Sequence, residues 1–148
     1  MAGYHLGHPD LDASLAVLLD VVRGSLIRSG MFPPFGIVWT PGREPAFVAA
    51  NFYQVAGRGL VDRVGDGLRR AAAEPDTRAV GLVHDSRIDR PFRPERAGAF
   101  RVDLEHRDGP ALTITVTWRK GWFNRVKLRV SETRPRLRKY FGPGTGES

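Results

Sequence analysis

Imidazole and carboxylate groups lie close together near the N-terminus, at spacings that can hold a metal ion. His5 and His8 are three residues apart and are followed by Asp10 and Asp12. Both ligand types suit zinc and related ions. These residues precede the first expected helix, however, and nothing in the sequence predicts a rigid cage around them. We therefore expect no metal and no cofactor.

Two further histidines have the chemistry for acid–base catalysis, because imidazole exchanges protons near neutral pH. His84 is followed by Asp85, and His106 ends a segment of alternating apolar and polar residues. Strand parity points both imidazoles inward near strand ends, where histidines are commonly packed and hydrogen-bonded. On adjacent antiparallel strands they would lie roughly 20 Å apart, at about 3.3 Å per residue. We assign no catalytic residue, and an enzyme is the third hypothesis.

Positive charge is concentrated near the C-terminus. Residues 1–118 contain 14 Arg, no Lys and 14 acidic residues, whereas residues 119–148 contain 9 basic and 2 acidic residues. The whole formal charge of +7 therefore lies in this last segment. Clustered charge of one sign attracts anionic partners. The candidates for binding a polyanion are Arg119, Lys120, Arg125, Lys127, Arg129, Arg134, Arg136, Arg138 and Lys139.

Aromatic residues are interleaved with these charges. The candidates for contact with a partner are Trp122, Phe123, Tyr140 and Phe141. Basic groups neutralise phosphates and aromatic rings stack on unpaired bases, so nucleic acid is one partner class that this composition suits. Recognition of RNA by stacking on a sheet needs rings on its open face. The outward face is instead expected to carry Arg101, Thr113, Thr115, Thr117, Lys127 and Arg129. The alternative is a solvated face with no anionic ligand.

The spacing of apolar residues predicts two helices. Leucine and valine residues between Leu11 and Leu26 recur at steps of three and four, which favours an amphipathic helix over residues 10–29. Asp10 is the expected N-cap and Gly30 the expected stop. A second helix is predicted over residues 60–73. Short strands are expected at 37–40 and 46–52.

Period-two alternation predicts strands at 79–87, 99–107, 112–118 and 125–131, as in an antiparallel sheet with one buried face. Asp108-Gly109 favours a tight hairpin turn. That turn would place apolar residues opposite polar ones, so we predict a three-residue loop of Asp108, Gly109 and Pro110, with Leu104 opposite Ile114. The loop Arg87–Arg96 is a second candidate contact surface.

These elements predict an α+β fold in which two helices pack on one face of an antiparallel sheet, in the order α-β-β-α-β-β-β(-β). The expected organisation is an N-terminal segment at 1–9, a single domain at 10–131 and a basic, then glycine-rich tail at 132–148. The sequence has no cysteine, which excludes disulfides and thiolate chemistry. Its start lacks the features of a signal peptide, so a cytoplasmic location is expected.

Three segments resemble a family of small bacterial α+β proteins that has no assigned function. They are Phe32-Pro-Pro-Phe-Gly36, Ala97–Gly109 with its Glu105-His-Arg-Asp-Gly109 ending, and Arg119-Lys-Gly-Trp-Phe-Asn-Arg-Val-Lys127. The resemblance covers roughly residues 10–130. It implies that the Arg119–Lys127 loop belongs to the domain and brings no catalytic residues.

Together these observations favour a protein-interaction module without enzymatic activity, which binds an unknown protein or forms a homodimer. The alternative is a module that binds nucleic acid or another polyanion through the basic C-terminal segment.

Overall fold

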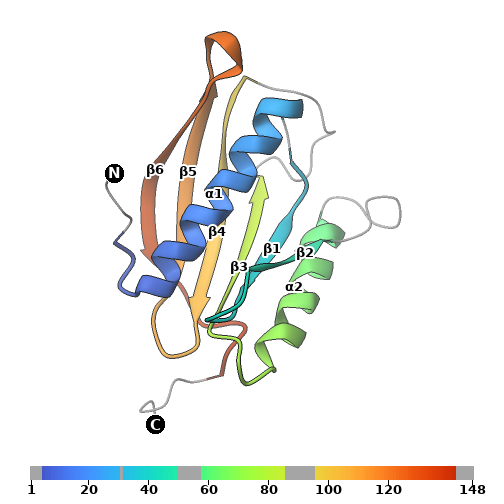
Figure 1. The fold of residues 1–148 in the computed structure, drawn as a ribbon, viewed down its shortest axis with the longest axis vertical. Helices are drawn as coiled ribbons and strands as arrows, with labels where there is room; N and C mark the ends of the chain where they lie inside the picture. Colours follow the sequence, from blue (N-terminus) through green and yellow to red (C-terminus); the bar gives the residue numbers. More distant parts are fainter. Residues whose placement is uncertain (1–4, 31, 50–57, 86–95, 143–148) are drawn as a thin grey trace.

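The computed structural model describes residues 5–30, 32–49, 58–85 and 96–142 (Figure 1). The order of elements is that expected from the sequence. They are α1 (Pro9–Ser29), β1 (Phe35–Trp39), β2 (Ala46–Ala49), α2 (Arg58–Ala72), β3 (Ala79–Asp85), β4 (Ala97–His106), β5 (Ala111–Lys120), the 3-10 turn η1 (Trp122–Asn124) and β6 (Val126–Pro135). The sequence-predicted contact loop at 87–95 and the end of the tail at 143–148 lie outside the described residues.

The six strands form one antiparallel sheet in the order β2-β1-β3-β4-β5-β6. The α+β class is therefore confirmed. The strands from β3 onward follow one another across the sheet as a meander, and β2 and β6 are its two edges. The β5–β6 hairpin lies at one end of the molecule, uppermost in Figure 1.

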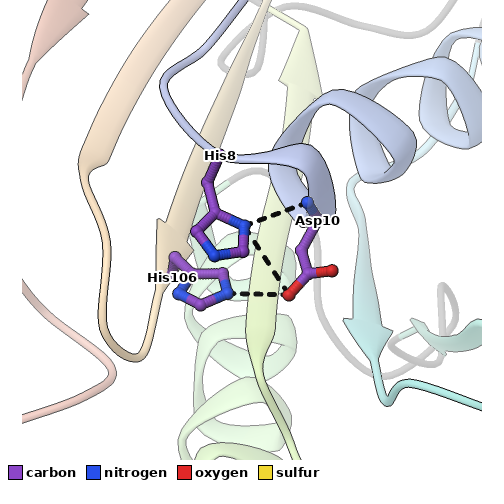
Figure 2. A group of neighbouring side chains, drawn as sticks. All are labelled: His8, Asp10 and His106. Atoms are coloured by element: carbon purple, nitrogen blue, oxygen red, sulfur yellow. Dashed lines mark hydrogen bonds and ion pairs between the residues drawn. The ribbon is translucent and has the colours of Figure 1, made fainter.

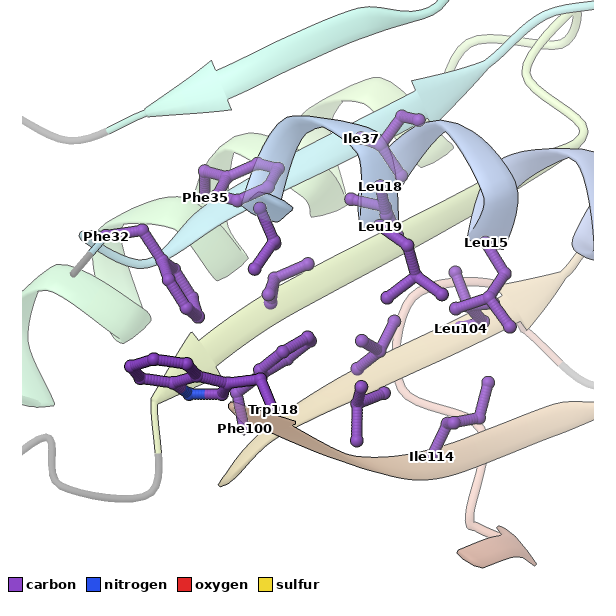
Figure 3. Packing of buried hydrophobic residues seen from close by; sticks show 14 of the residues in the cluster. Leu15, Leu18, Leu19, Phe32, Phe35, Ile37, Phe100, Leu104, Ile114 and Trp118 are labelled. Atoms are coloured by element: carbon purple, nitrogen blue, oxygen red, sulfur yellow. The ribbon is translucent and has the colours of Figure 1, made fainter. Parts of the chain in front are cut away.

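Helix α1 crosses one face of the sheet and forms the main core with it. Its apolar stripe meets side chains that alternate along β1, β3, β4 and β5. Figure 3 shows leucines of α1, such as Leu15 and Leu18, above Leu104 and Ile114 of the strands. The helix ends at Gly30, as predicted, in the left-handed conformation with φ 71°. Its N-cap is His8 rather than Asp10, because the His8 ring accepts the Asp10 N–H.

Helix α2 packs on the opposite face, which corrects the expectation that both helices share one face. Its residues Val64 and Leu68 form a second cluster with Val38, Val80 and Leu82. These strand residues alternate with Ile37 and Val83, which belong to the α1 cluster. Strands β1 and β3 are thus apolar on both faces, whereas β4 and β5 alternate. The uninterrupted apolar run in β3 is the sequence signal of burial on both sides.

The β4–β5 hairpin has the predicted three-residue loop, but the loop begins one residue earlier. His106 N–H donates to the Pro110 carbonyl, so the loop consists of residues 107–109. Leu104 therefore pairs with Leu112 rather than Ile114. The predicted faces are unchanged, because the shift is of two residues. The Asp108 N–H donates to the His106 ring and the Asp108 carboxylate pairs with Arg78, and these contacts hold Asp108 within the loop.

The chain after residue 131 is part of the folded domain as far as the structure describes it. Strand β6 continues to Pro135, so the sequence-based boundary at 131 lies inside this strand. The following segment turns onto the α2 face, where Tyr140 and Phe141 join the second cluster. The buried Glu105 carboxylate accepts backbone N–H groups from Lys139, Tyr140 and Phe141 at 2.6–3.0 Å.

Within the described residues, no helix has the length and apolar character needed to span a membrane.

Candidate anion-binding face

Helix α2 covers β1, β2 and β3, and the other part of the same sheet face is cationic. We call this part the open face. Thr117 and the basic residues around it point to this side of β4, β5 and β6, alternating with core residues on the α1 side. Its exposed members are Arg101, Thr117, Arg119, Lys127, Arg129, Glu132 and Arg134, with half-buried Asp103, Thr113 and Thr115 among them. The prediction that Arg101, Thr113, Thr115, Thr117, Lys127 and Arg129 lie on the outward face is confirmed.

Two basic residues of the open face stand directly opposite each other. Arg119 of β5 pairs in register with Lys127 of β6. Like charges in this position destabilise a sheet, because their Cβ atoms are only about 4.5–5.5 Å apart. Neither side chain forms an ion pair with a carboxylate among the residues that the structure describes. An anion bound between them would convert this repulsion into attraction.

The tip of the β5–β6 hairpin presents two aromatic rings to solvent. Trp122 is 87% exposed and Phe123 is 92% exposed. Phe123 has φ 58°, in the left-handed region, and no other non-glycine residue with a described backbone shares this sign. A bulky side chain there costs roughly 1–2 kcal/mol. The hairpin thus exposes two large apolar side chains and also carries backbone strain.

Hydrogen bonds hold the backbone of this tip in place. Gly121 N–H donates to the Arg125 carbonyl, and Arg125 N–H donates to the Trp122 carbonyl. Lys120 N–H donates to the Arg96 carbonyl at the start of β4. The rings therefore project from a braced turn, which lowers the conformational entropy lost when a ligand binds them.

Two hollows adjoin this tip. The first has a volume of about 500 Å³ and is lined by Gly121 and by Arg119, Trp122, Phe123, Arg125 and Lys127. The second, of about 480 Å³, lies along the strands and is lined by Ala97, Gly98, Thr117, Trp118, Arg119, Lys127 and Arg129. Arg119 and Lys127 line both hollows, so the two hollows are neighbours, and we call them together the groove.

The nine basic candidates separate into groups with different surroundings. Arg119, Arg125, Lys127 and Arg129 are exposed along the groove. Three others contact the protein itself. Lys120 Nζ donates to the Leu26 and Ile27 carbonyls at the end of α1. Arg136 pairs with Asp103 at 3.0 Å. Arg138 donates to the carbonyls of His106, Arg107, Gly109 and Gly142.

The two remaining basic candidates lie away from the groove lining. Arg134 is exposed on β6 and pairs with Glu132. Lys139 is exposed and its ammonium lies 5.9 Å from the Tyr140 ring centroid. We therefore restrict the candidate site to the four groove residues, with Arg101 as a neighbour on the same face. Arg101 was predicted to face outward but was not among the binding candidates.

Of the four aromatic candidates, only the two at the hairpin tip can contact a partner with their rings. Tyr140 and Phe141 are buried between α2 and the sheet. Burial raises the pKa of the Tyr140 hydroxyl. The guanidinium of Arg107 lies 4.6 Å from the centroid of the Phe141 ring. These two residues join the C-terminal segment to the domain. The sequence did not predict this role, because both residues lie near the end of the chain.

A histidine–aspartate cluster forms where the N-terminal segment meets the end of β4 (Figure 2). His106 Nε2 lies 2.8 Å from Asp10 Oδ2, and the His8 ring stacks on the His106 ring at 3.7 Å between centroids. His106 is 1% exposed. Two of the four residues proposed as metal ligands are here, and Asp12 instead accepts the Leu6 N–H.

The donors around these rings do not fit a metal ion. Asp10 N–H donates to His8 Nδ1, and Asp108 N–H donates to His106 Nδ1. A ring nitrogen that accepts a hydrogen bond is unprotonated, so each neutral imidazole carries its proton on Nε2. Metal-ligating histidines almost always donate their second ring N–H instead. The cluster therefore joins the N-terminal segment to the domain, with His106 Nε2–H donating to Asp10.

His84 and His106 do not come together. Cα pairing places His84 opposite Arg101 and His106 opposite Ala79, toward different ends of the β3–β4 ladder. Their side chains also point to opposite faces, because His106 follows the parity of Leu104 and His84 that of Leu82. His84 Nε2 lies 3.9 Å from Asp103 Oδ2. The arrangement brings no nucleophile, acid and base together among the described residues around either histidine.

No family model, no curated protein and no solved structure matches this chain. The assignment of a function therefore depends on the geometry of its own residues.

Proposed function

We propose that this chain is a cytoplasmic, non-enzymatic binding module whose ligand is an anionic polymer. The observation that carries this proposal is the direct opposition of Arg119 and Lys127 on an exposed sheet face, where neither forms an ion pair with a carboxylate of the residues that the structure describes. Selection for stability alone would replace one of them, since like charges opposite each other are destabilising. A bound phosphate or sulfate group between them removes that cost.

The surrounding residues extend the site in one direction. Arg129 follows Lys127 on the same face of β6, about 6.6 Å along the strand, and Arg125 lines the tip hollow. An array of cations along a groove suits a ligand with several charges in a line better than a single small anion. Neutralising several charges in this way releases counterions, which makes the affinity depend strongly on salt.

The test is fluorescence anisotropy with labelled DNA and RNA, single- and double-stranded, and with labelled heparin fragments, at 50 and 200 mM salt. Four phosphate contacts predict a loss of affinity of about 50-fold between these salt concentrations for a single strand, at a slope of about 0.7 per phosphate. The variant Arg119→Gln/Lys127→Gln should lose at least 10-fold in affinity at 50 mM salt.

The matched control is Arg43→Gln/Arg70→Gln, which removes the same amount of charge. Arg43 and Arg70 are exposed and lie away from the groove, beyond the end of β1 and near the end of α2. This variant should keep its affinity within about twofold. Absence of binding to every polymer at 50 mM salt, or an equal loss in both variants, would refute a site on the open face.

A protein partner is the second candidate, and the exposure of Trp122 and Phe123 favours it. Aromatic side chains are enriched at protein interfaces, and β6 is an edge strand onto which another chain can add. If copies of this chain associate through the tip, Trp122→Glu should lower the mass measured by light scattering. Phe141→Glu is unsuitable for this purpose because Phe141 is buried. A monomeric mass for the unmodified chain would exclude self-association at that concentration.

A further inference from the structure

The hairpin tip adds an aromatic surface to the proposed anion site. The first hollow is lined by Trp122 and Phe123 and by the basic residues Arg119, Arg125 and Lys127. Its volume of about 500 Å³ lies within the range of small-molecule sites, about 300–1,000 Å³. A ligand that fills it presents a flat apolar group to the rings and negative charge to the basic side chains.

The second hollow shows how such a ligand continues. It shares Arg119 and Lys127 with the first and leads past Thr117 to Arg129. The groove therefore combines stacking surfaces at its outer end with cations along its length. A single-stranded nucleic acid has the matching pattern, because its backbone is uniformly charged and its bases are free to stack.

Two other polyanions fit this arrangement less well. In a duplex the bases are already stacked on one another, so a protein that binds only its phosphates has no use for exposed rings. A bilayer meets a projecting tip end-on, so that aromatic side chains enter the interface. Arg129 lies along the strands rather than at the tip, and a flat surface that meets the tip end-on does not reach it.

We infer that the ligand of this groove is a single-stranded nucleic acid, with a base stacked on Trp122 and Phe123 and the following phosphates held by Arg119, Lys127 and Arg129. This inference rests on the proposed function and adds the stacking of bases to it. Phe123, whose backbone is left-handed, lines the same hollow as Trp122 and gives the site a second aromatic ring.

The decisive experiment compares two ligands that have the same phosphates. Anisotropy is measured for the unmodified chain with a labelled 12-nucleotide oligo(dT), with oligo(U), and with an abasic oligodeoxynucleotide of equal length. Stacking is worth about 1–3 kcal/mol per base, so the base-containing strands should bind about 5- to 150-fold more tightly than the abasic strand. Comparison of oligo(dT) with oligo(U) distinguishes DNA from RNA as the preferred strand.

The variant arm assigns the effect to the tip. Trp122→Ala should reduce the affinity for oligo(dT) at least fivefold and leave the affinity for the abasic strand unchanged, whereas Trp122→Phe should retain most of it. Leu137→Ala is the control, because Leu137 is 89% exposed and does not line either hollow. Equal unfolding midpoints in urea establish that the variants are folded.

The outcomes separate this inference from the function on which it rests. Equal affinity for the abasic and base-containing strands overturns base stacking and leaves a general polyanion site. Binding to vesicles of phosphatidylcholine with 30% phosphatidylserine, with a Trp122-dependent blue shift of the fluorescence and no preference for bases, overturns it in favour of a membrane surface. Absence of binding to oligonucleotides, heparin and vesicles alike overturns both.

Discussion

The carboxylate of Glu105 accepts the backbone N–H of Tyr140 at 3.0 Å in the interior of the protein. The neighbouring N–H groups of Lys139 and Phe141 point to the same carboxylate. A buried charge is tolerated when hydrogen bonds satisfy it, and three N–H donors do so here. Through this one side chain, β4 fixes the segment that carries Tyr140 and Phe141 into the second cluster.

Replacement of Glu105 should therefore weaken the whole domain. Glu105→Gln leaves one acceptor oxygen and places an amide N–H₂ against the backbone donors. Hydrogen bonds to charged groups contribute roughly 1.5–3 kcal/mol each, so we expect a loss of about 2–4 kcal/mol in the free energy of unfolding. Urea denaturation measures this loss. An unchanged midpoint would mean that the C-terminal segment is not held by Glu105.

The opposed pair Arg119 and Lys127 should lower stability in the free protein. We expect Arg119→Gln/Lys127→Gln to raise the free energy of unfolding by about 0.2–1 kcal/mol in low salt, because the cross-strand repulsion disappears. The gain should shrink as salt is added, because salt screens the repulsion in the unmodified chain and leaves less of it for the substitution to remove. Urea unfolding at two salt concentrations measures it, and a loss of stability would contradict a repulsive pair.

Lys120 and Lys127 should behave differently, although both belong to the basic segment. Lys120→Met removes two hydrogen bonds and a positive charge from the C-terminal end of α1, so we expect it to cost about 1 kcal/mol of stability. Its effect on anion affinity should be below twofold. Lys127→Met should lower the affinity without loss of stability, and it should raise the free energy of unfolding by about 0.2–1 kcal/mol because it too removes the cross-strand repulsion. The two variants measured side by side in unfolding and anisotropy assays test this division.

Phe123→Gly should be more stable than the unmodified chain. Glycine adopts a positive φ without steric cost, so the strain of the left-handed phenylalanine, about 1 kcal/mol, is relieved. Part of this gain is offset because glycine makes the unfolded chain more flexible. Thermal unfolding measures the difference. A clear destabilisation would show that the exposed ring makes stabilising contacts at the tip.

Acidification should destabilise the protein through His106. Burial is the main cause that lowers the pKa of His106 below its usual 6.5; the hydrogen bond to Asp10 opposes it and the charge of His8 adds to it. Below pH 6.5 the unfolded chain takes up a proton that the folded chain does not yet bind. Stability therefore falls as the pH drops below 6.5, by up to about 1.4 kcal/mol per pH unit, until the folded pKa is reached.

Urea unfolding at pH 7.5 and 5.5 checks this dependence. The midpoint of the unmodified chain should fall at the lower pH, and His106→Gln should fall less, because glutamine does not titrate. An identical fall in both proteins would assign the pH dependence to other groups.

Local patterns in the sequence predicted the elements of the fold well, because both helices and the strands of the meander carry strong periodicity. The same patterns did not predict the face of the sheet on which α2 packs. Val80 and Val83 are both apolar in β3, and this run was interpreted as alternation with one buried face. Parity alone does not identify a strand that is buried on both sides, because apolar residues then occupy both alternating sets and no polar set marks a solvent-facing side.

The candidate site was predicted in part, for a related reason. Charge and aromatic content located the Arg119–Arg129 segment, and strand parity assigned its outward residues. The sequence could not separate Lys127, which faces the groove, from Arg138, which binds carbonyls of the β4–β5 loop. That separation depends on contacts between residues about 30 positions apart, which no local pattern records. A still larger separation, of 96 positions, concealed His106 as the partner of Asp10.

The segment at residues 139–141, whose N–H groups Glu105 binds, lies near the end of the chain, and this position bears on how the protein folds during synthesis. During synthesis the acceptor Glu105 leaves the ribosome before the N–H groups that it binds, and β5 leaves before the edge strand that covers it. Until residue 141 has emerged, the nascent domain exposes to solvent the Glu105 carboxylate and the apolar side chains beside α2, which are buried in the complete fold. The domain therefore completes its fold only after the basic hairpin has been translated, and the preceding interval is when the growing chain is most open to aggregation or to a chaperone.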